Sequence, residues 1–123
     1  FDSLDGIVLP GGMPGTIHLG ESACVQGVIR KFAEEGKLVS AICAAPSVLG
    51  QAGLLQGKSA TCYPGFEEQL LGAEAKADSV VVDETIITSR SMATAISFSL
   101  EIVRYFMGDE KVVELSNSLV MNK

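Results

Sequence analysis

The sequence predicts an α/β domain in which helices cover both faces of a mostly parallel sheet. Short apolar runs alternate along the chain with longer stretches of helical periodicity. Most of the 13 glycines and four prolines lie between these periodic segments. With 123 residues, of which 47% are hydrophobic and 20% charged, the chain suits one compact domain, residues 1–123.

The first strand and helix are predicted at the start of the chain. The apolar run at residues 6–9 stops at a Pro-Gly-Gly turn, which favours a buried strand followed by a loop at residues 13–20. Apolar residues spaced by one, three and four positions then predict a helix over residues 21–35. Gly36 is placed to end that helix, and Cys24 falls on its apolar, core-facing side.

Two further strand and helix pairs are predicted in the middle of the chain. Residues 37–42 are apolar and β-branched enough for a second strand, and residues 44–52 favour a helix that the next glycine ends. Residues 58–62 predict a short third strand. A proline at position 64 suits the first turn of a brief helix that runs to residue 71.

The last part of the sequence predicts a hairpin and two helices. Two β-branched runs, residues 79–82 and 85–88, flank a two-residue polar link, which is typical of an antiparallel pair. Residues 92–107 predict the longest helix, and residues 110–116 a final short one.

Composition excludes several classes of function. A net charge of −6 gives no basic surface for nucleic acid, and no apolar run reaches the ~18 residues that a membrane span needs. There is no signal peptide pattern at the start of the chain. Three cysteines without framework spacing indicate reduced thiols in the cytoplasm, and one histidine with distant cysteines gives no metal-ligand set, so no metal is expected.

Cys43 is the residue most suggestive of chemistry. It lies between a predicted strand and a predicted helix, with the small residues Ala41 and Ala45 two positions away on either side, as a sharp nucleophile elbow requires. A helix N-terminus would favour its thiolate form, and the N–H groups of Gly12 and Ala44 could hold one oxyanion. The alternative is a cysteine that packs as a small hydrophobic residue.

Other candidate residues carry weaker signals. His18 is more typical of a surface loop residue than of a base for Cys43. Arg90 lies between two serines before a helix, so it fits an anion site or an ordinary surface ion pair. Cys62 ends a strand beside Tyr63 and suits either a packed thiol or a resolving thiol.

Three segments in this order resemble the ThiJ/PfpI superfamily, in the branch that contains the parkinsonism-linked human protein. They are Val8-Leu9-Pro10-Gly11-Gly12, then Ala41-Ile42-Cys43-Ala44-Ala45-Pro46, then Thr88-Ser89-Arg90. Class I glutamine amidotransferases share the elbow, but they need a His-x-Glu pair after the cysteine, and no histidine follows Cys43.

The resemblance implies a flavodoxin-like three-layer sandwich, a homodimer, and no cofactor. It implies that Cys43 is an oxidation-sensitive nucleophile, that Gly12 and Ala44 offer oxyanion-side amides, and that Gly11 and Arg90 belong to the substrate or anion pocket. Family members are described as glyoxalases or deglycases for small α-oxoaldehydes, as redox sensors or chaperones, and in older naming as thiazole monophosphate biosynthesis proteins or proteases.

The chain departs from the family pattern in two ways. Tyr63 stands where some members carry a histidine, and a phenol is a poor base near neutral pH. The family's glutamate partner of the cysteine precedes residue 1, and Glu21 lies too far into the next helix to replace it. The expectation is therefore an N-terminally incomplete domain whose first strands and carboxylate come from a separate polypeptide of the same protein, or from a part of it that this chain does not include.

Overall fold

The centre of the molecule is a four-stranded sheet, seen in a computed structural model that describes residues 3–119. The strand order is β1-β2-β6-β5, where β1 is Gly6–Leu9, β2 is Leu38–Ile42, β5 is Val80–Asp83 and β6 is Ile86–Ser89. β1, β2 and β6 run parallel, and β5 pairs antiparallel with β6. The predicted parallel sheet and the predicted hairpin are both confirmed.

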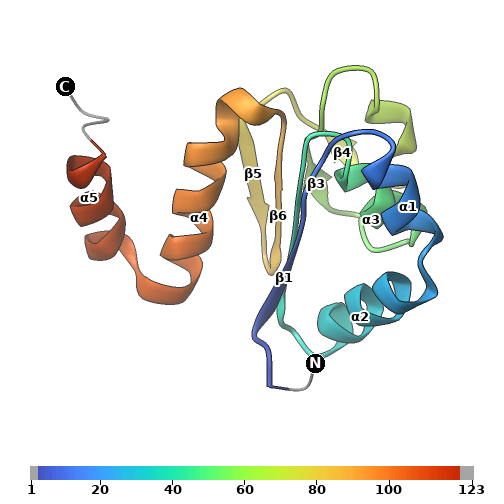
Figure 1. Cartoon of the computed structure of the whole chain (residues 1–123), viewed down its shortest axis with the longest axis horizontal. Coiled ribbons are helices and arrows are strands. Elements are labelled where there is room, and N and C mark those ends of the chain that lie inside the picture. The colour runs from blue at the N-terminus through green and yellow to red at the C-terminus, as the bar shows by residue number, and fades with distance from the viewer. Residues whose placement is uncertain (1–2, 120–123) are drawn as a thin grey trace.

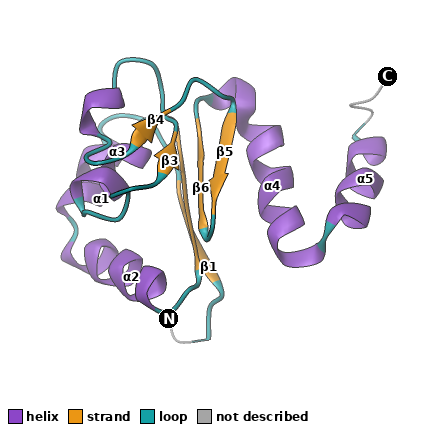
Figure 2. Cartoon of the chain, turned by 180° about the vertical axis from the view of Figure 1, so that it is seen from behind, coloured by secondary structure: helices purple, strands orange, loops and turns teal. Residues whose placement is uncertain are grey.

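Helices cover the two faces of this sheet, which gives the predicted three layers (Figure 1). α1 (Gly15–Glu21), α2 (Ala23–Glu34) and α3 (Pro46–Gln51) lie on one face, and α4 (Ala95–Met107) lies on the other. α5 (Asp109–Ser118) packs against α4 on the side away from the sheet (Figure 2). A 3₁₀ turn, η2, precedes α4 at Met92–Thr94.

Two apolar clusters hold the layers together. The larger lies between the sheet and helices α1–α3, and its largest fully buried members are Phe32, Ile29, Leu49, Leu55 and Val39. The smaller lies under α4 and contains Leu38, Ile87 and Phe98. β2 contributes to both clusters because successive residues of a strand point to opposite faces of its sheet.

The prediction of a loop at residues 13–20 is wrong, because most of this segment forms α1. The Thr16 side chain donates a hydrogen bond of 2.9 Å to the Gly12 carbonyl, which ties the first turn of the helix down. Glycines at both ends of this seven-residue helix hide its periodicity in the sequence. Ser22 then separates α1 from α2, and its hydroxyl accepts a 3.2 Å hydrogen bond from the Val25 N–H as an N-cap.

The segment between α3 and β5 is less regular than predicted. The third strand, β3, has only two residues, Ser59–Ala60, and pairs with β4 at Glu74–Ala75 in a separate small sheet. The helix predicted over residues 64–71 is a single 3₁₀ turn, η1, at Glu67–Gln69. These short elements lie above α3, near the carboxyl edge of the main sheet (Figure 1).

β1 is an edge strand within the described part of the chain. It pairs with β2 on one side, and no strand among residues 3–119 pairs with its other side. Gly6 and Val8 lie on the face of the strand that points to α4, because they alternate with residues on the other face. A Cβ atom at Gly6 would contact Phe106 of α4. Val8, by contrast, is 47% exposed although it is apolar. Within residues 3–119, the free edge of β1 and its face at Val8 are therefore uncovered.

Candidate thiol site at the carboxyl edge of the sheet

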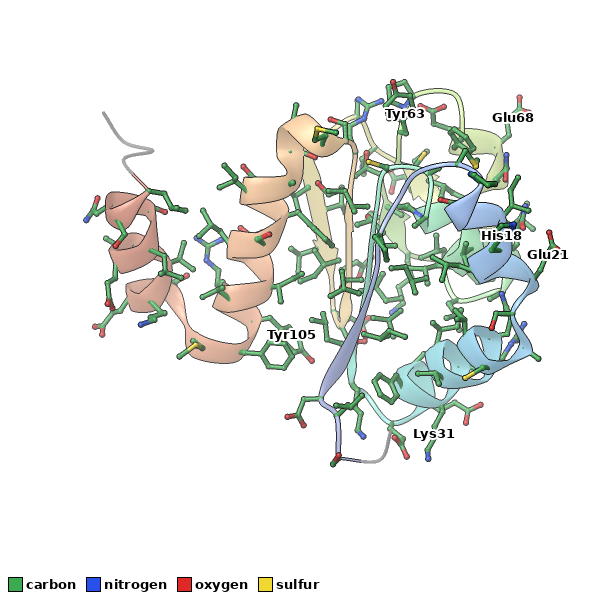
Figure 3. All side chains as sticks on the ribbon, in the orientation of Figure 1. His18, Glu21, Lys31, Tyr63, Glu68 and Tyr105 are labelled. Atoms are coloured by element: carbon green, nitrogen blue, oxygen red, sulfur yellow. The ribbon has the colours of Figure 1, made fainter. Side chains whose placement is uncertain are left out.

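The segments after β1, β2 and β6 meet at one edge of the sheet because the three strands are parallel. Gly11, Cys43 and Arg90 each follow one of these strands by one or two residues. Tyr63, from the loop after β3, lies at the same edge (Figure 3). The structure therefore brings together the segments that the sequence singled out.

Cys43 has the strained backbone of a nucleophile elbow. Its φ is +62°, a left-handed conformation that residues other than glycine rarely adopt. Two backbone hydrogen bonds hold it there, because its N–H donates to the Ser89 carbonyl at 3.1 Å and its carbonyl accepts from the Tyr63 N–H at 2.7 Å. The side chain is half-buried, so its sulfur is neither sealed in the core nor free in solvent.

Gly11 packs directly against this elbow. A Cβ atom at position 11 would lie 2.3 Å from the Cys43 Cβ, 3.2 Å from its Sγ and 2.9 Å from the Ile42 carbonyl oxygen. The first of these distances is far inside van der Waals contact, so the glycine lets one strand end approach the thiol.

A cavity of about 230 Å³ opens beside the thiol. Its lining consists of Gly12, Met13, Cys43, Ala44, Tyr63 and Phe66. Within residues 3–119, the N–H groups of Gly12 and Ala44 donate to no acceptor, whereas the carbonyls of both residues are occupied. Two backbone N–H groups without an acceptor, near a half-buried sulfur, could stabilise a developing oxyanion.

No base is found next to the sulfur among the described residues. The residues that line the thiol cavity include no carboxylate and no histidine. His18 is exposed on α1, as the sequence suggested, and Figure 3 shows it on the outer side of that helix. Glu21 lies at the end of the same helix and lines a different cavity.

Arg90 is committed to other partners. Its Nε donates to the Cys62 carbonyl at 3.1 Å, one terminal nitrogen donates to the Ala77 carbonyl at 3.0 Å, and the other lies 3.7 Å from a Glu67 carboxylate oxygen. It is not among the residues that line the thiol cavity. The ion pair that the sequence left open is present, and the anion-binding role stays a prediction.

The other two cysteines differ sharply from each other. Cys24 is exposed on α2, so the prediction that it belongs to the core is wrong. The helix turns Val28, Ile29 and Phe32 inward instead. Cys62 is 1% exposed, and burial, with the negative charge of Glu67, raises the pKa of its thiol to about 11. It is a packed thiol, as one of the two interpretations held.

Met13 and Phe66 were missed as walls of the cavity, as were two residues that fasten its backbone. Thr16 and Ser47 donate their hydroxyl hydrogens to the Gly12 and Ala44 carbonyls, at 2.9 and 2.6 Å. Each lies one helical turn after its acceptor, four and three residues on, so spacing alone could have suggested both contacts.

Residues 3–119 contain neither a metal-binding cluster nor a helix suited to a membrane. No group of three or more histidine, cysteine, aspartate or glutamate side chains is arranged to hold a metal ion. Among the helices of that range, none has both the length and the apolar character to cross a bilayer.

An α/β sandwich with a strained cysteine after a central parallel strand defines a class of proteins with a nucleophile elbow. Residues 1–105 match the DJ-1/PfpI family, and the chain belongs to that family. The resemblance predicted from its three segments is therefore confirmed.

Relatives and solved structures agree with this assignment. Drosophila melanogaster protein dj-1beta is 42% identical over 98% of this chain and 65% of its own length, and its crystal structure superimposes with a TM-score of 0.89. A Caenorhabditis elegans relative named glutathione-independent glyoxalase is 32% identical over 98% of this chain and 65% of its own. A Pyrococcus horikoshii relative named deglycase is 37% identical over 84% and 63%.

The structure of oxidized Toxoplasma gondii DJ-1 is also similar. It has 34% identity and a TM-score of 0.91 over 97% of this chain and 65% of its own. This chain thus spans about 65% of the length of several of the proteins it matches, and only 27% of Arabidopsis thaliana DJ-1 homolog B.

Proposed function

We propose that the protein containing this chain converts small α-oxoaldehydes to hydroxy acids, for example methylglyoxal to lactate, through Cys43 and without a cofactor. The observation that carries the proposal is the elbow itself. A cysteine held at a positive φ borders a 230 Å³ cavity, and two other residues of its lining, Gly12 and Ala44, have backbone N–H groups that meet no acceptor within residues 3–119. The names of the glyoxalase and deglycase relatives support the same chemistry.

The proposed reaction begins when the Cys43 thiolate adds to the aldehyde carbon. The carbonyl oxygen becomes an oxyanion that the N–H groups of Gly12 and Ala44 stabilise, and its protonation gives a hemithioacetal. Hydrogen then moves from C1 to C2, which oxidises the aldehyde carbon to a thioester and reduces the ketone to an alcohol. Water hydrolyses the thioester, and the products are the hydroxy acid and the free thiol.

The proton transfers need a base that we place outside residues 1–123. The described lining of the thiol cavity contains no carboxylate, and the uncovered edge of β1 could accept a further strand. We therefore propose that a preceding segment of the same protein, as a separate or continuous polypeptide, brings a carboxylate within hydrogen-bond reach of the Cys43 sulfur. An active preparation of residues 1–123 alone would contradict this part.

A homodimer in the cytoplasm is part of the proposal. Met92 in η2 and Ile96 at the start of α4 are 88% and 52% exposed and support an apolar contact between two copies. The odd cysteine count supports a reducing compartment. The partner is then a small aldehyde, with no role for nucleic acid or membrane. Light scattering that gives the mass of a monomer would contradict the dimer.

The decisive assay follows methylglyoxal loss and lactate formation without glutathione. Three versions of the full-length protein that contains this chain are compared. They are the unchanged protein, Cys43→Ala, and Cys24→Ala, which is the control at an exposed cysteine outside the cavity. We expect Cys43→Ala to lose activity to the uncatalysed rate and Cys24→Ala to retain it. Equal rates in all three proteins would remove Cys43 from the mechanism.

The second candidate function is an oxidative-stress sensor or chaperone that acts through oxidation of Cys43. Its half-buried thiol next to a cavity favours this function too, since a sulfinic acid formed there could use the same N–H donors. Peroxide titration with peptide mass spectrometry tests it. Cys43 should oxidise before Cys24 and Cys62, and the reverse order would contradict the sensor.

A further inference from the structure

A second cavity lies between α1, α3 and η1, next to the thiol cavity. We call it the α1–α3 cavity. Its volume is about 360 Å³, and Met13 and Phe66 line both this cavity and the thiol cavity. The flexible side chain of Met13 and the planar ring of Phe66 therefore form a wall that the two cavities share.

The backbone of the proposed oxyanion site is hydrogen-bonded to residues of the second cavity. Gly12 and Ala44 line the thiol cavity, and their carbonyl oxygens accept from Thr16 and Ser47, which line the α1–α3 cavity. A molecule bound at Cys43 with a tail that passes Met13 and Phe66 would enter the second space.

The polar atoms of the α1–α3 cavity are mostly hydrogen-bond acceptors. The hydroxyls of Thr16 and Ser47 have already donated their hydrogens to carbonyls, so they offer only lone pairs. Gln51 donates its side-chain N–H to the Gln69 oxygen at 3.1 Å, so its own carbonyl oxygen is left as an acceptor. Gln69 keeps both N–H bonds of its amide and Gln51 keeps one, so these two amide nitrogens are the side-chain donors in this lining.

A negative charge adds to this imbalance. Glu21 lines the cavity at the end of α1, and within residues 3–119 no lysine, arginine or histidine forms an ion pair with it. The cavity lining itself contains no cationic residue. Acceptors and a carboxylate together attract a group rich in N–H bonds and positive charge.

We propose that the α1–α3 cavity is a cation-binding subsite for an ammonium or guanidinium tail. The tail belongs to the molecule whose carbonyl reacts with Cys43. This proposal rests on the proposed function for the role of Cys43, and it adds a preference for cationic substrates over neutral or anionic ones of the same length. The preference comes from Glu21 and from the acceptors along the wall.

The test uses three thiol-alkylating probes of equal length. Each is an iodoacetamide whose tail ends in a guanidinium, a hydroxyl or a carboxylate, and alkylation of each cysteine is followed by peptide mass spectrometry. Exposed Cys24 is an internal reference, because the net charge of −6 attracts a cationic reagent to every site. The measured quantity is therefore the alkylation rate of Cys43 divided by that of Cys24.

We expect this ratio to be about three- to fivefold higher for the guanidinium probe than for the hydroxyl probe, the size of a partly exposed ion pair. Glu21→Gln should remove most of this advantage. Glu68→Gln is the matched control, because Glu68 is exposed on η1 and lies outside the cavity lining (Figure 3). Equal ratios for the three probes, or an equal effect of both substitutions, would overturn the subsite.

The methylglyoxal assay separates the two proposals. A cation preference at Cys43 without methylglyoxal turnover would leave the subsite standing and contradict the proposed function. Turnover that depends on Cys43, with no cation preference in the alkylation ratio, would contradict the subsite and leave the function.

Discussion

Replacement of Gly11 by alanine tests the close approach on which the site depends. The new Cβ would lie 2.3 Å from the Cys43 Cβ and 2.9 Å from the Ile42 carbonyl oxygen, and neither atom is the free end of a flexible side chain. Relief requires the end of β1 or the elbow to move. Overpacking of this kind costs about 1–3 kcal/mol, and contact with fixed backbone places Gly11→Ala at the upper end of that range.

Alanine substitutions at two other glycines distinguish the cost of steric overlap from the cost of backbone strain. Gly12 has a φ of +100° and an ideal Cβ there meets no atom within 4 Å, so Gly12→Ala should cost only the positive-φ penalty of about 1–2 kcal/mol. Gly27 is exposed inside α2, also with no atom within 4 Å. Gly27→Ala should stabilise by about 0.5–1 kcal/mol through helix propensity.

Urea unfolding followed by circular dichroism measures the three free-energy changes. The alkylation rate of Cys43 by iodoacetamide reports on the elbow directly, and Gly11→Ala should change it more than Gly12→Ala. If Gly11→Ala is as stable as the unchanged protein and leaves that rate unchanged, Gly11 does not pack against Cys43 and the geometry of the site is wrong.

Three further predictions concern side chains around the elbow. Cys43→Gly should be about 1 kcal/mol more stable than Cys43→Ala in urea, because glycine adopts a φ of +62° without penalty. Cys62, whose thiol has a pKa of about 11, should resist iodoacetamide at pH 8. The folded protein holds this proton more tightly than the unfolded chain does. The free energy of unfolding that Cys62 contributes should therefore fall as the pH rises from about 9 to 11, which unfolding curves measure. Arg90→Lys should cost about 2 kcal/mol through lost charge-assisted hydrogen bonds and raise the proteolysis rate of the Tyr63–Phe66 loop; an unchanged cleavage rate would contradict its tethering role.

The parallel sheet could be predicted because its information is local. The strands that begin at residues 6, 38 and 86 are apolar or β-branched runs, and a two-residue polar link is enough to identify the hairpin. α1 could not be predicted in the same way. Its seven residues begin with a glycine after Pro14 and are anchored by Thr16, a contact that exists only once the turn has formed.

The elbow was predictable for a similar reason. Small residues on both sides of Cys43 and a glycine turn after the preceding strand are visible in one dimension, and parallel topology brings them to one edge. The far wall of the cavity was not predictable. Tyr63 and Phe66 line the cavity because the path of the loop after β3 places them there, and no periodicity encodes that path.

Arg90 shows how position along the chain and position in space can lead to different roles. It follows β6 at the functional edge, where a cation could face a bound anion, but its side chain runs back to the Cys62 and Ala77 carbonyls and to Glu67. The Glu67 carboxylate also accepts from the Gly65 N–H at 2.8 Å. Its own backbone N–H and that of Gly65 hold the pKa of Glu67 below its ordinary value.

These contacts tie both ends of the segment that carries Tyr63 and Phe66. Cys62 precedes the segment and Glu67 follows it, and both contact the same guanidinium. The N–H of Tyr63 in turn donates to the Cys43 carbonyl. A loop with little regular structure can form a fixed wall beside the thiol because Arg90 contacts the residues at its two ends and the elbow holds Tyr63 near its start. In this arrangement the contacts of Arg90 help to fix the position of two residues, Tyr63 and Phe66, that line the thiol cavity.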